Sequence, residues 1–232
     1  MNESMNSLDS LAPFMERAKR SYELKELERL GLSPDLEQRE AILTHLALVL
    51  QANKSADLIP EGDEDQIFFR HFCDSIQLLL LLGFKKNAVV LDIDSCGGFP
   101  AVPIGILRPD LTLILTESNR KRAAFLCELK AALKVNIMAV HANKPENIVL
   151  SKKVDYVITR RAGTLQKFAL SARPFLSKDG RMYTYKTKSF TSELDTMTEN
   201  KDRDGIRICE IAQYGLGGQM RGLHLVSMEF VR

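Results

Sequence analysis

The sequence is poor in cysteine, lacks any long apolar run and carries almost no net charge. Its four cysteines show no CxxC spacing, so they form no metal-binding pattern and are expected to be reduced, buried thiols: Cys73, Cys96, Cys127 and Cys209. The longest apolar run, Leu78–Leu82, is far too short to span a bilayer. The start, Met1–Ser4, lacks the basic and then apolar order of a signal peptide. We therefore expect a cytoplasmic protein with no metal and no membrane partner.

The formal net charge of the 232 residues is only +2, which limits any contact with nucleic acid to a local patch. Hydrophobic residues make up 45% and charged residues 27% of the chain, which predicts a folded protein with a sizeable core. The length suits one large domain with a smaller helical part. We expect a helical subdomain at 1–84 and an α/β domain at 85–232.

The first third of the chain has the periodicity of helices, predicted at Met15–Leu30, Asp35–Gln51 and Ile67–Leu82. After that, short apolar runs alternate with helical stretches, which is typical of a doubly wound, mostly parallel sheet. The predicted strands are Val89–Ile93, Leu111–Thr116, Asn136–Val140, Val154–Thr159 and Arg181–Tyr185, followed by a closing antiparallel pair at Ile206–Tyr214 and Gly222–Val231.

The stretch Val89–Ala101 reads as a buried strand, a glycine-containing turn and a helix. Such a turn presents backbone N–H groups at the start of the helix, where α/β sheets hold nucleotide-like ligands. An ordinary tight turn is the alternative, because Gly-Gly pairs are common in loops. Glu117 follows the second strand about 20 residues later, where an acid can accept hydrogen bonds from both hydroxyls of an adenosine ribose. This spacing favours a nucleoside cofactor over a surface glutamate.

Basic residues gather near the predicted carboxyl edge of the sheet. Arg70 and His71 share one side of the third predicted helix, although a solvated charged face is the alternative. Thr159–Arg161 ends the fourth strand, and its two arginines suit phosphate contacts or stacking on a base unless they are only surface residues. Lys186 and Lys188 end the next strand on the same edge, so together these residues predict a local basic rim.

Six short motifs follow one another in a fixed order: Asn53–Leu58, Arg70–Ser75, Asp92–Pro100, Arg108–Asp110, Glu117–Arg122 and Asp155–Arg160. In this order they resemble the motifs of the RsmG family (GidB, glucose-inhibited division protein B). The resemblance runs from about Ala52 to Lys186, with a weaker tail to the end of the chain. It identifies the chain as a divergent member of that family.

The resemblance implies the Rossmann-like fold of class I methyltransferases, with one antiparallel strand near the C-terminus and an N-terminal helical extension. It implies transfer of a methyl group from S-adenosylmethionine to N7 of a guanine in small-subunit (16S) ribosomal RNA. That RNA or the small ribosomal subunit is the expected partner, and a monomer is expected. Since N7 carries a free lone pair, catalysis needs positioning and no general base.

Roles transfer only where residues match the family. Arg160 would lie where cofactor and substrate meet and would position them. The cofactor site would comprise Asp92, Asp94, Ser95, Gly97, Gly98, Phe99, Glu117, Asn143, Lys144, Pro145 and Arg160, and RNA would contact Arg70, His71, Arg161, Lys186 and Lys188.

The chain departs from the family pattern in the same cleft. Asp94, Cys96 and Ala101 replace three glycines of the loop, Asn143 stands where the family tends to have arginine, and Arg161–Ala162 replaces a small and an aromatic residue. The first glycine often permits a positive φ, whereas Asp94 adds a Cβ and a negative charge near the expected methionine carboxylate. Repulsion of about 1–4 kcal/mol would weaken cofactor binding roughly tenfold to a thousandfold. A non-catalytic relative that binds RNA or the ribosome is therefore the alternative function.

Overall fold

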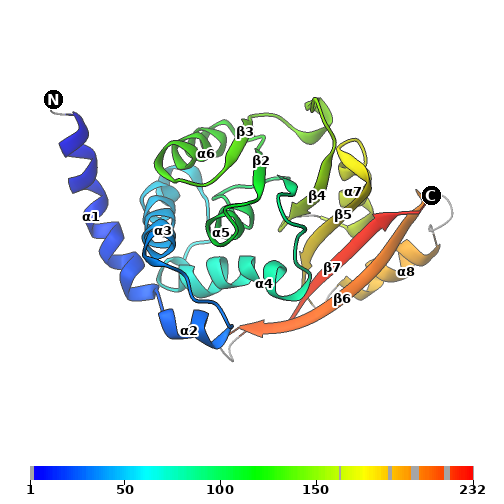
Figure 1. Ribbon diagram of the computed structural model, residues 1–232, viewed down its shortest axis with the longest axis horizontal. Helices are drawn as coiled ribbons and strands as arrows, with labels where there is room; N and C mark the ends of the chain where they lie inside the picture. The colour runs from blue at the N-terminus through cyan, green and yellow to red at the C-terminus, as the bar shows by residue number, and fades with distance from the viewer. Residues whose placement is uncertain (1–2, 162, 188–189, 200–203, 217–219, 232) are drawn as a thin grey trace.

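The computed structural model of the protein describes residues 3–161, 163–187, 190–199, 204–216 and 220–231 (Figure 1). Within these ranges, seven strands form one sheet in the order β3-β2-β1-β4-β5-β7-β6. The strands are β1 (Val89–Asp92), β2 (Thr112–Thr116), β3 (Ile137–His141), β4 (Val154–Thr159), β5 (Leu176–Lys186), β6 (Ile206–Leu216) and β7 (Met220–Phe230). Strands β1 to β5 run parallel to one another, and β7 runs antiparallel to both β5 and β6. The predicted doubly wound sheet with one antiparallel strand is confirmed.

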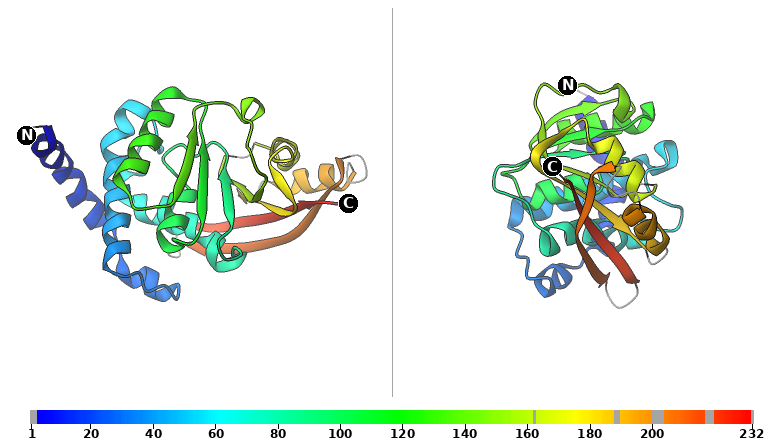
Figure 2. Two further views of the ribbon diagram at one scale, coloured as in Figure 1. Left: turned by 45° about the horizontal axis from the view of Figure 1, so that its top comes forward. Right: turned by 90° about the vertical axis from the view of Figure 1, so that its right-hand side faces the viewer.

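Helices cover both faces of the sheet, as Figure 2 shows from two further directions. Successive side chains of a strand point to opposite faces, and the buried residues divide into two clusters on that basis. Val90 and Ile158 belong to the cluster that packs under the helices of the first half of the chain. Leu91 and Val157 belong to the cluster on the other face, under the later helices. The helices are α1 (Glu3–Ser21), α2 (Leu24–Arg29), α3 (Leu36–Ala56), α4 (Asp74–Leu81), α5 (Ala101–Leu107), α6 (Arg120–Ala132), α7 (Leu165–Ala172) and α8 (Thr191–Glu199).

The N-terminal helices lie along one side of the sheet, with α1 at the outer edge of the molecule (Figure 1). Buried Leu27, Ile42 and Phe72 share one hydrophobic cluster with sheet residues such as Val90. The division into 1–84 and 85–232 stays a prediction. Along the described chain, no helix combines the length and the apolar character needed to cross a membrane.

Three predicted elements differ from the structure. The helix expected at Met15–Leu30 is two helices, because Glu23 has an extended backbone that ends the run after α1. Helix α3 starts after Asp35, whose carboxylate accepts the N–H of Gln38 while that side chain accepts the N–H of Asp35, and this capping box sets the start. The third predicted helix is irregular: its first part is the π-helix η2 (Phe68–Cys73), preceded by the 3-10 turn η1 (Glu64–Gln66), and α4 follows.

The fifth strand is also longer than predicted. Asp179–Gly180 reads as a turn in the sequence, but both residues lie inside β5, which starts at Leu176. An irregularity in the pairing of β4 with β5, between Val154 and Tyr156, accommodates them. The sequence signal therefore marks a bulge and not a chain reversal.

Candidate active site at the carboxyl edge of the sheet

The loop between β1 and α5 has a left-handed backbone, typical of glycine, at two residues that are not glycine. Asp94 has a φ of 58° and Cys96 a φ of 51°, and Gly98 has a φ of 83°. A left-handed conformation costs a non-glycine residue about 1–2 kcal/mol, and Asp is among the residues that tolerate it best. The rest of the fold therefore holds these two residues in the conformation that glycine would adopt freely.

The backbone N–H groups of this loop are largely used within the protein. Those of Gly98 and Phe99 both donate to the carbonyl of Ser95, at 2.8 and 3.1 Å. The N–H of Cys96 donates to Oε2 of Glu117 at 3.2 Å. The expectation of free N–H groups at Gly97–Gly98 is wrong for Gly98, because the loop forms its own turn before α5 begins.

Two acids, Asp92 and Glu117, lie at the ends of β1 and β2. Glu117 is buried and accepts the N–H of Asn119 at 2.8 Å as well as that of Cys96. A carboxylate has about four acceptor positions, so about two remain for further donors. Asp92 is fully buried beside Ser95 and the first residue of α5, Ala101, lines none of the cavities at this edge, and has a pKa that burial raises well above its usual range. Glu117 is therefore the acid that keeps acceptor positions for a ligand.

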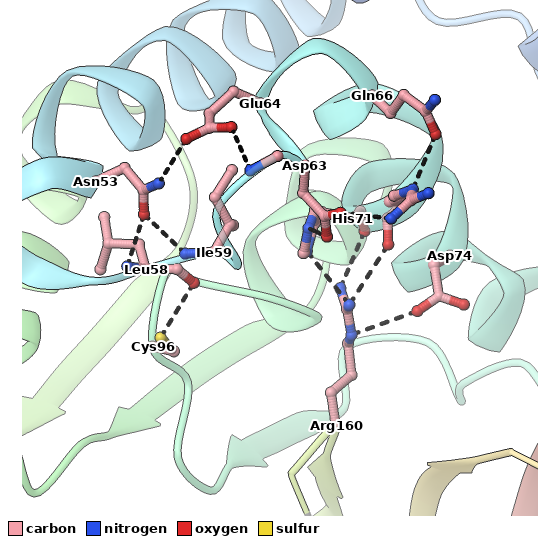
Figure 3. A network of polar contacts seen from close by, with 12 residues as sticks. Asn53, Leu58, Ile59, Asp63, Glu64, Gln66, His71, Asp74, Cys96 and Arg160 are labelled. Carbon is pink, nitrogen blue, oxygen red and sulfur yellow. Dashed lines mark hydrogen bonds and ion pairs between the residues drawn. The ribbon is translucent and has the colours of Figure 1, made fainter.

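The segment after α3 packs against the loop between β1 and α5, and Asn53 holds this segment in place, as Figure 3 shows. Oδ1 of Asn53 accepts the N–H groups of Leu58 and Ile59, both at 2.9 Å. The Cys96 thiol in turn donates to the carbonyl of Leu58 at 3.3 Å. Cys96 thus docks the loop onto the segment that follows α3.

Three cavities open at this edge. The first, of about 190 Å³, and the second, of about 200 Å³, are both lined by Asp94 and Arg161. The third, of about 300 Å³, shares Pro60, His71 and Arg160 with the first. A continuous ligand site would therefore run from the second cavity through the first to the third.

Arg160 lies where the first and third cavities meet. Its guanidinium forms its contacts with other groups of the protein (Figure 3). Nε lies 3.3 Å from Oδ2 of Asp74. The remaining contacts are to the carbonyls of Arg70 and His71, Oγ of Ser75 and Nδ1 of His71, at 3.2 to 3.5 Å. Its Cζ lies 5.7 and 5.9 Å from the ring centroids of Phe99 and Tyr185. The predicted positioning residue is thus a fixed wall between two cavities.

His71 is held as a neutral ring. Since an N–H of Arg160 points at its Nδ1, that nitrogen accepts, and Nε2–H donates to Oδ2 of Asp63 at 2.9 Å. Burial and the neighbouring Arg160 charge lower the pKa of His71 to about 4. Oδ1 of Asp63 accepts from Arg70 at 2.6 Å, so Asp63 bonds two of the five predicted RNA-contacting residues, Arg70 and His71.

The structure brings several predicted residues to the cavities and leaves others apart. Arg70, His71 and Lys186 line the third cavity. The ammonium of Lys186 is paired with Glu193 at 2.8 Å, and its side chain is only 8% exposed. Pro145 lines the second cavity. The neighbours predicted beside the adenine, Asn143 and Lys144, are exposed and line none of the three cavities, and Lys188 lies outside the described residues.

Sequence reasoning missed three residues of the site, namely His45, Asp63 and Tyr214. The hydroxyl of Tyr214, on β6, donates to Oδ1 of Asp74 at 2.5 Å. Asp63 precedes the predicted helix in a polar loop, and His45 looks like an ordinary core position of α3. No local pattern marks His45 and Tyr214, because their partners are distant in sequence. Asp63 bonds Arg70 and His71, seven and eight positions later, but lies in a loop outside the predicted helix. No three His, Cys, Asp or Glu side chains gather as metal ligands in the described part of the chain.

His45 predicts a specific sensitivity to acid. Its ring is buried, lies 4.8 Å from the Phe99 ring, and its Nε2 bonds the carbonyl of Gly97 at 2.8 Å. Burial lowers the pKa of His45 to about 4, so the unfolded chain takes up a proton first as the pH falls below 6.5. Between pH 7 and pH 5 the protein should lose about 2 kcal/mol of unfolding free energy through this residue.

Urea unfolding at both pH values measures this loss. The His45→Gln variant should lose about 2 kcal/mol less than the wild type between pH 7 and pH 5, whereas the same change at the partly exposed His141 is the matched control. Equal losses in the wild type and the His45 variant would contradict the assignment.

The sheet order, the loop after β1, the acid after β2 and the cavities at the carboxyl edge define a class I methyltransferase. Solved structures of this fold superpose on the chain. The glycopeptide N-methyltransferase MtfA complexed with sinefungin is 13% identical, with a TM-score of 0.57 over 70% of this chain and 87% of that one. TYW2 of M. jannaschii in complex with AdoMet is 16% identical, with a TM-score of 0.53 over 69% of this chain and 76% of that one.

Sequence comparisons identify the family within this class of methyltransferases. The family model GidB, rRNA small subunit methyltransferase G, matches residues 38–216. Ribosomal RNA small subunit methyltransferase G of Pseudomonas paraeruginosa is 30% identical over 75% of this chain and 80% of the relative. The protein of the same name from Stutzerimonas stutzeri is 29% identical over 79% and 85%. The chain therefore belongs to the GidB family of rRNA small subunit methyltransferases.

Proposed function

We propose that this chain transfers a methyl group from S-adenosylmethionine to N7 of a guanine in 16S rRNA. The observation that supports this most directly is the pair of adjoining cavities that share Pro60, His71 and Arg160. The glycine-loop residues border one of them, and the basic and aromatic side chains of Arg70 and Tyr185 border the other. Cofactor and RNA base would meet beside Arg160.

The residues at the loop fit the cofactor. Glu117 keeps about two free acceptor positions, enough for the two hydroxyls of a ribose. Asp94, Cys96 and Phe99 of the loop line the first cavity, where the cofactor would lie against them. When bound, S-adenosylmethionine supplies an electrophilic methyl group.

The chain's own part in the reaction is positioning. N7 of guanine already has a lone pair, so no side chain has to remove a proton before attack. His71 is no base candidate here, since its Nδ1 accepts from Arg160. Arg160 is fixed by its contacts to Asp74 and Ser75 and would hold the cofactor and the base in the right relative position. Such positioning can supply much of the rate enhancement.

On the RNA side, the third cavity suits an unpaired guanine. Tyr185 and Tyr214 offer aromatic surface for stacking, while Arg70 offers positive charge to phosphates. We further propose that the partner is 16S rRNA or the small ribosomal subunit, that the protein is a monomer and that it works in the cytoplasm.

A non-catalytic relative remains a second candidate because of one observation. The Asp94 side chain lines both cavities of the cofactor cleft, at a position where the family has glycine. Its carboxylate would repel the cofactor if nothing offset its charge. Such a protein would keep the RNA rim without methyl transfer.

Methyl transfer can be tested with S-adenosylmethionine carrying an isotopically labelled methyl group and 16S rRNA that lacks the family's modification. After nuclease digestion, mass spectrometry should find the label in 7-methylguanosine from a single nucleotide. The Arg70→Gln variant should lower kcat/KM about tenfold through the KM for RNA, and Lys85→Gln, before β1 at the opposite edge, should leave it unchanged. Label in another nucleoside would overturn the N7 assignment. Unlabelled RNA despite cofactor binding would favour the non-catalytic candidate.

A further inference from the structure

Asp94 and Arg161 occupy a special place in the cleft, because each lines both of its cavities. Asp94 comes from the loop after β1, and Arg161 is the second residue after the end of β4, the neighbouring strand. The two residues therefore face the same space from two adjacent strands. Both are departures from the family pattern described above.

Their charges are opposite but do not neutralise each other by contact. Across the described ranges, neither side chain forms a hydrogen bond or an ion pair, with the other or with a third residue. Of the other charged residues nearby, Arg122 is paired with Asp57 at 2.7 Å, whereas Glu117 keeps acceptor positions and Lys167 lines the second cavity beside them. A carboxylate and a guanidinium thus border the space between them with their hydrogen-bonding groups unused.

A zwitterion fits this arrangement better than a simple anion or cation does. Its ammonium group can donate to a carboxylate, while its carboxylate can accept two parallel bonds from a guanidinium. Charge-assisted hydrogen bonds of this kind are about twice as strong as neutral ones. The methionine end of the proposed cofactor carries both groups on one carbon atom.

We propose that Asp94 and Arg161 together bind the amino-acid end of the cofactor, Asp94 through its ammonium and Arg161 through its carboxylate. This inference rests on the proposed function and specifies how the altered loop meets its ligand. The positive charge of Arg161 offsets the repulsion that Asp94 alone would exert on the carboxylate. Arg161 is then a cofactor residue, whereas the sequence predicts an RNA contact.

Isothermal titration tests the pair with two ligands. S-adenosylhomocysteine carries the amino-acid end, and 5′-methylthioadenosine lacks it. Asp94→Asn keeps the shape and tolerates a positive φ, so the fold should persist. Asp94→Asn and Arg161→Gln should each weaken S-adenosylhomocysteine binding roughly tenfold to a hundredfold, and the two losses should multiply in the double variant. Their affinity for 5′-methylthioadenosine should stay within about twofold of the wild type.

Arg120→Gln, which removes a charge from the exposed start of α6 and lines neither cavity, is the matched control and should bind both ligands like the wild type. If Asp94→Asn binds S-adenosylhomocysteine as tightly as the wild type or more tightly, the proposed pair is wrong and Asp94 repels the carboxylate of the cofactor. If the wild type binds neither ligand, the cofactor site and the proposed function fall together.

Discussion

Replacement of Arg160 by methionine should lower the free energy of unfolding by about 3 kcal/mol, the lower end of what breaking a buried ion pair costs. Asp74 would lose its cationic partner, and the carbonyls of Arg70 and His71 would lose their donor. For a chain of this length the loss corresponds to a fall of about 6–12 °C in Tm. Methyl transfer should fall further than stability explains, because both cavities lose their common wall.

Two further variants make this expectation specific. Arg160→Lys keeps the charge but lacks the planar fork, so it should be intermediate in stability. Combining Arg160→Met with Asp74→Leu removes both partners and should cost less than the sum of the single changes. An Arg160→Met protein within about 0.5 kcal/mol of the wild type would show that the Asp74 contact does not stabilise the site.

The second large effect is expected at Gly98. An alanine Cβ there would lie 2.8 Å from Cγ2 of Val102 and 3.0 Å from Cδ1 of Leu129, while the backbone has a φ of +83°. The left-handed backbone costs about 1–2 kcal/mol and overpacking about 1–3 kcal/mol, so Gly98→Ala should destabilise the protein by about 2–5 kcal/mol. Urea unfolding gives the loss, and titration with S-adenosylhomocysteine should show weakened binding.

Gly31 provides the matched control. Its φ is +77°, but a Cβ would meet nothing within 4 Å. Gly31→Ala should therefore show the backbone cost alone, about 1–2 kcal/mol, without a change in ligand binding. Equal losses at the two glycines would mean that the packing around the loop yields to an extra methyl group.

Much of the fold follows from local pattern. Strand β4 has the predicted ends, Val154–Thr159, because it is a short apolar segment between clear turns. The placement of Glu117 and Arg160 at the carboxyl edge follows from the alternation of strands and helices. Prediction is good wherever a residue's surroundings are set by its neighbours in sequence.

The details of the site depend on contacts that no local pattern encodes. Asp74 and Tyr214 are 140 positions apart, and His45 lies 52 positions from the Gly97 carbonyl that it bonds. The pairing of Lys186 with Glu193 likewise depends on how α8 packs. Asp94 is a similar case. Its charge alone suggests repulsion of the cofactor's carboxylate, whereas its place beside Arg161 at the same two cavities supports the proposed pair that binds the cofactor's amino-acid end.

The position of Tyr214 also bears on the order in which a growing chain becomes a working enzyme. Strand β6 pairs only with β7 in the described sheet, and β7 follows it in the chain. During synthesis, β6 therefore has no place in the sheet until residues 220–230 have left the ribosome. Asp74 and Arg160 are made long before, but the hydroxyl that completes their network takes its place only once β7 can pair with β6. A nascent chain can thus form the parallel sheet early and close its catalytic edge only after β7 has emerged.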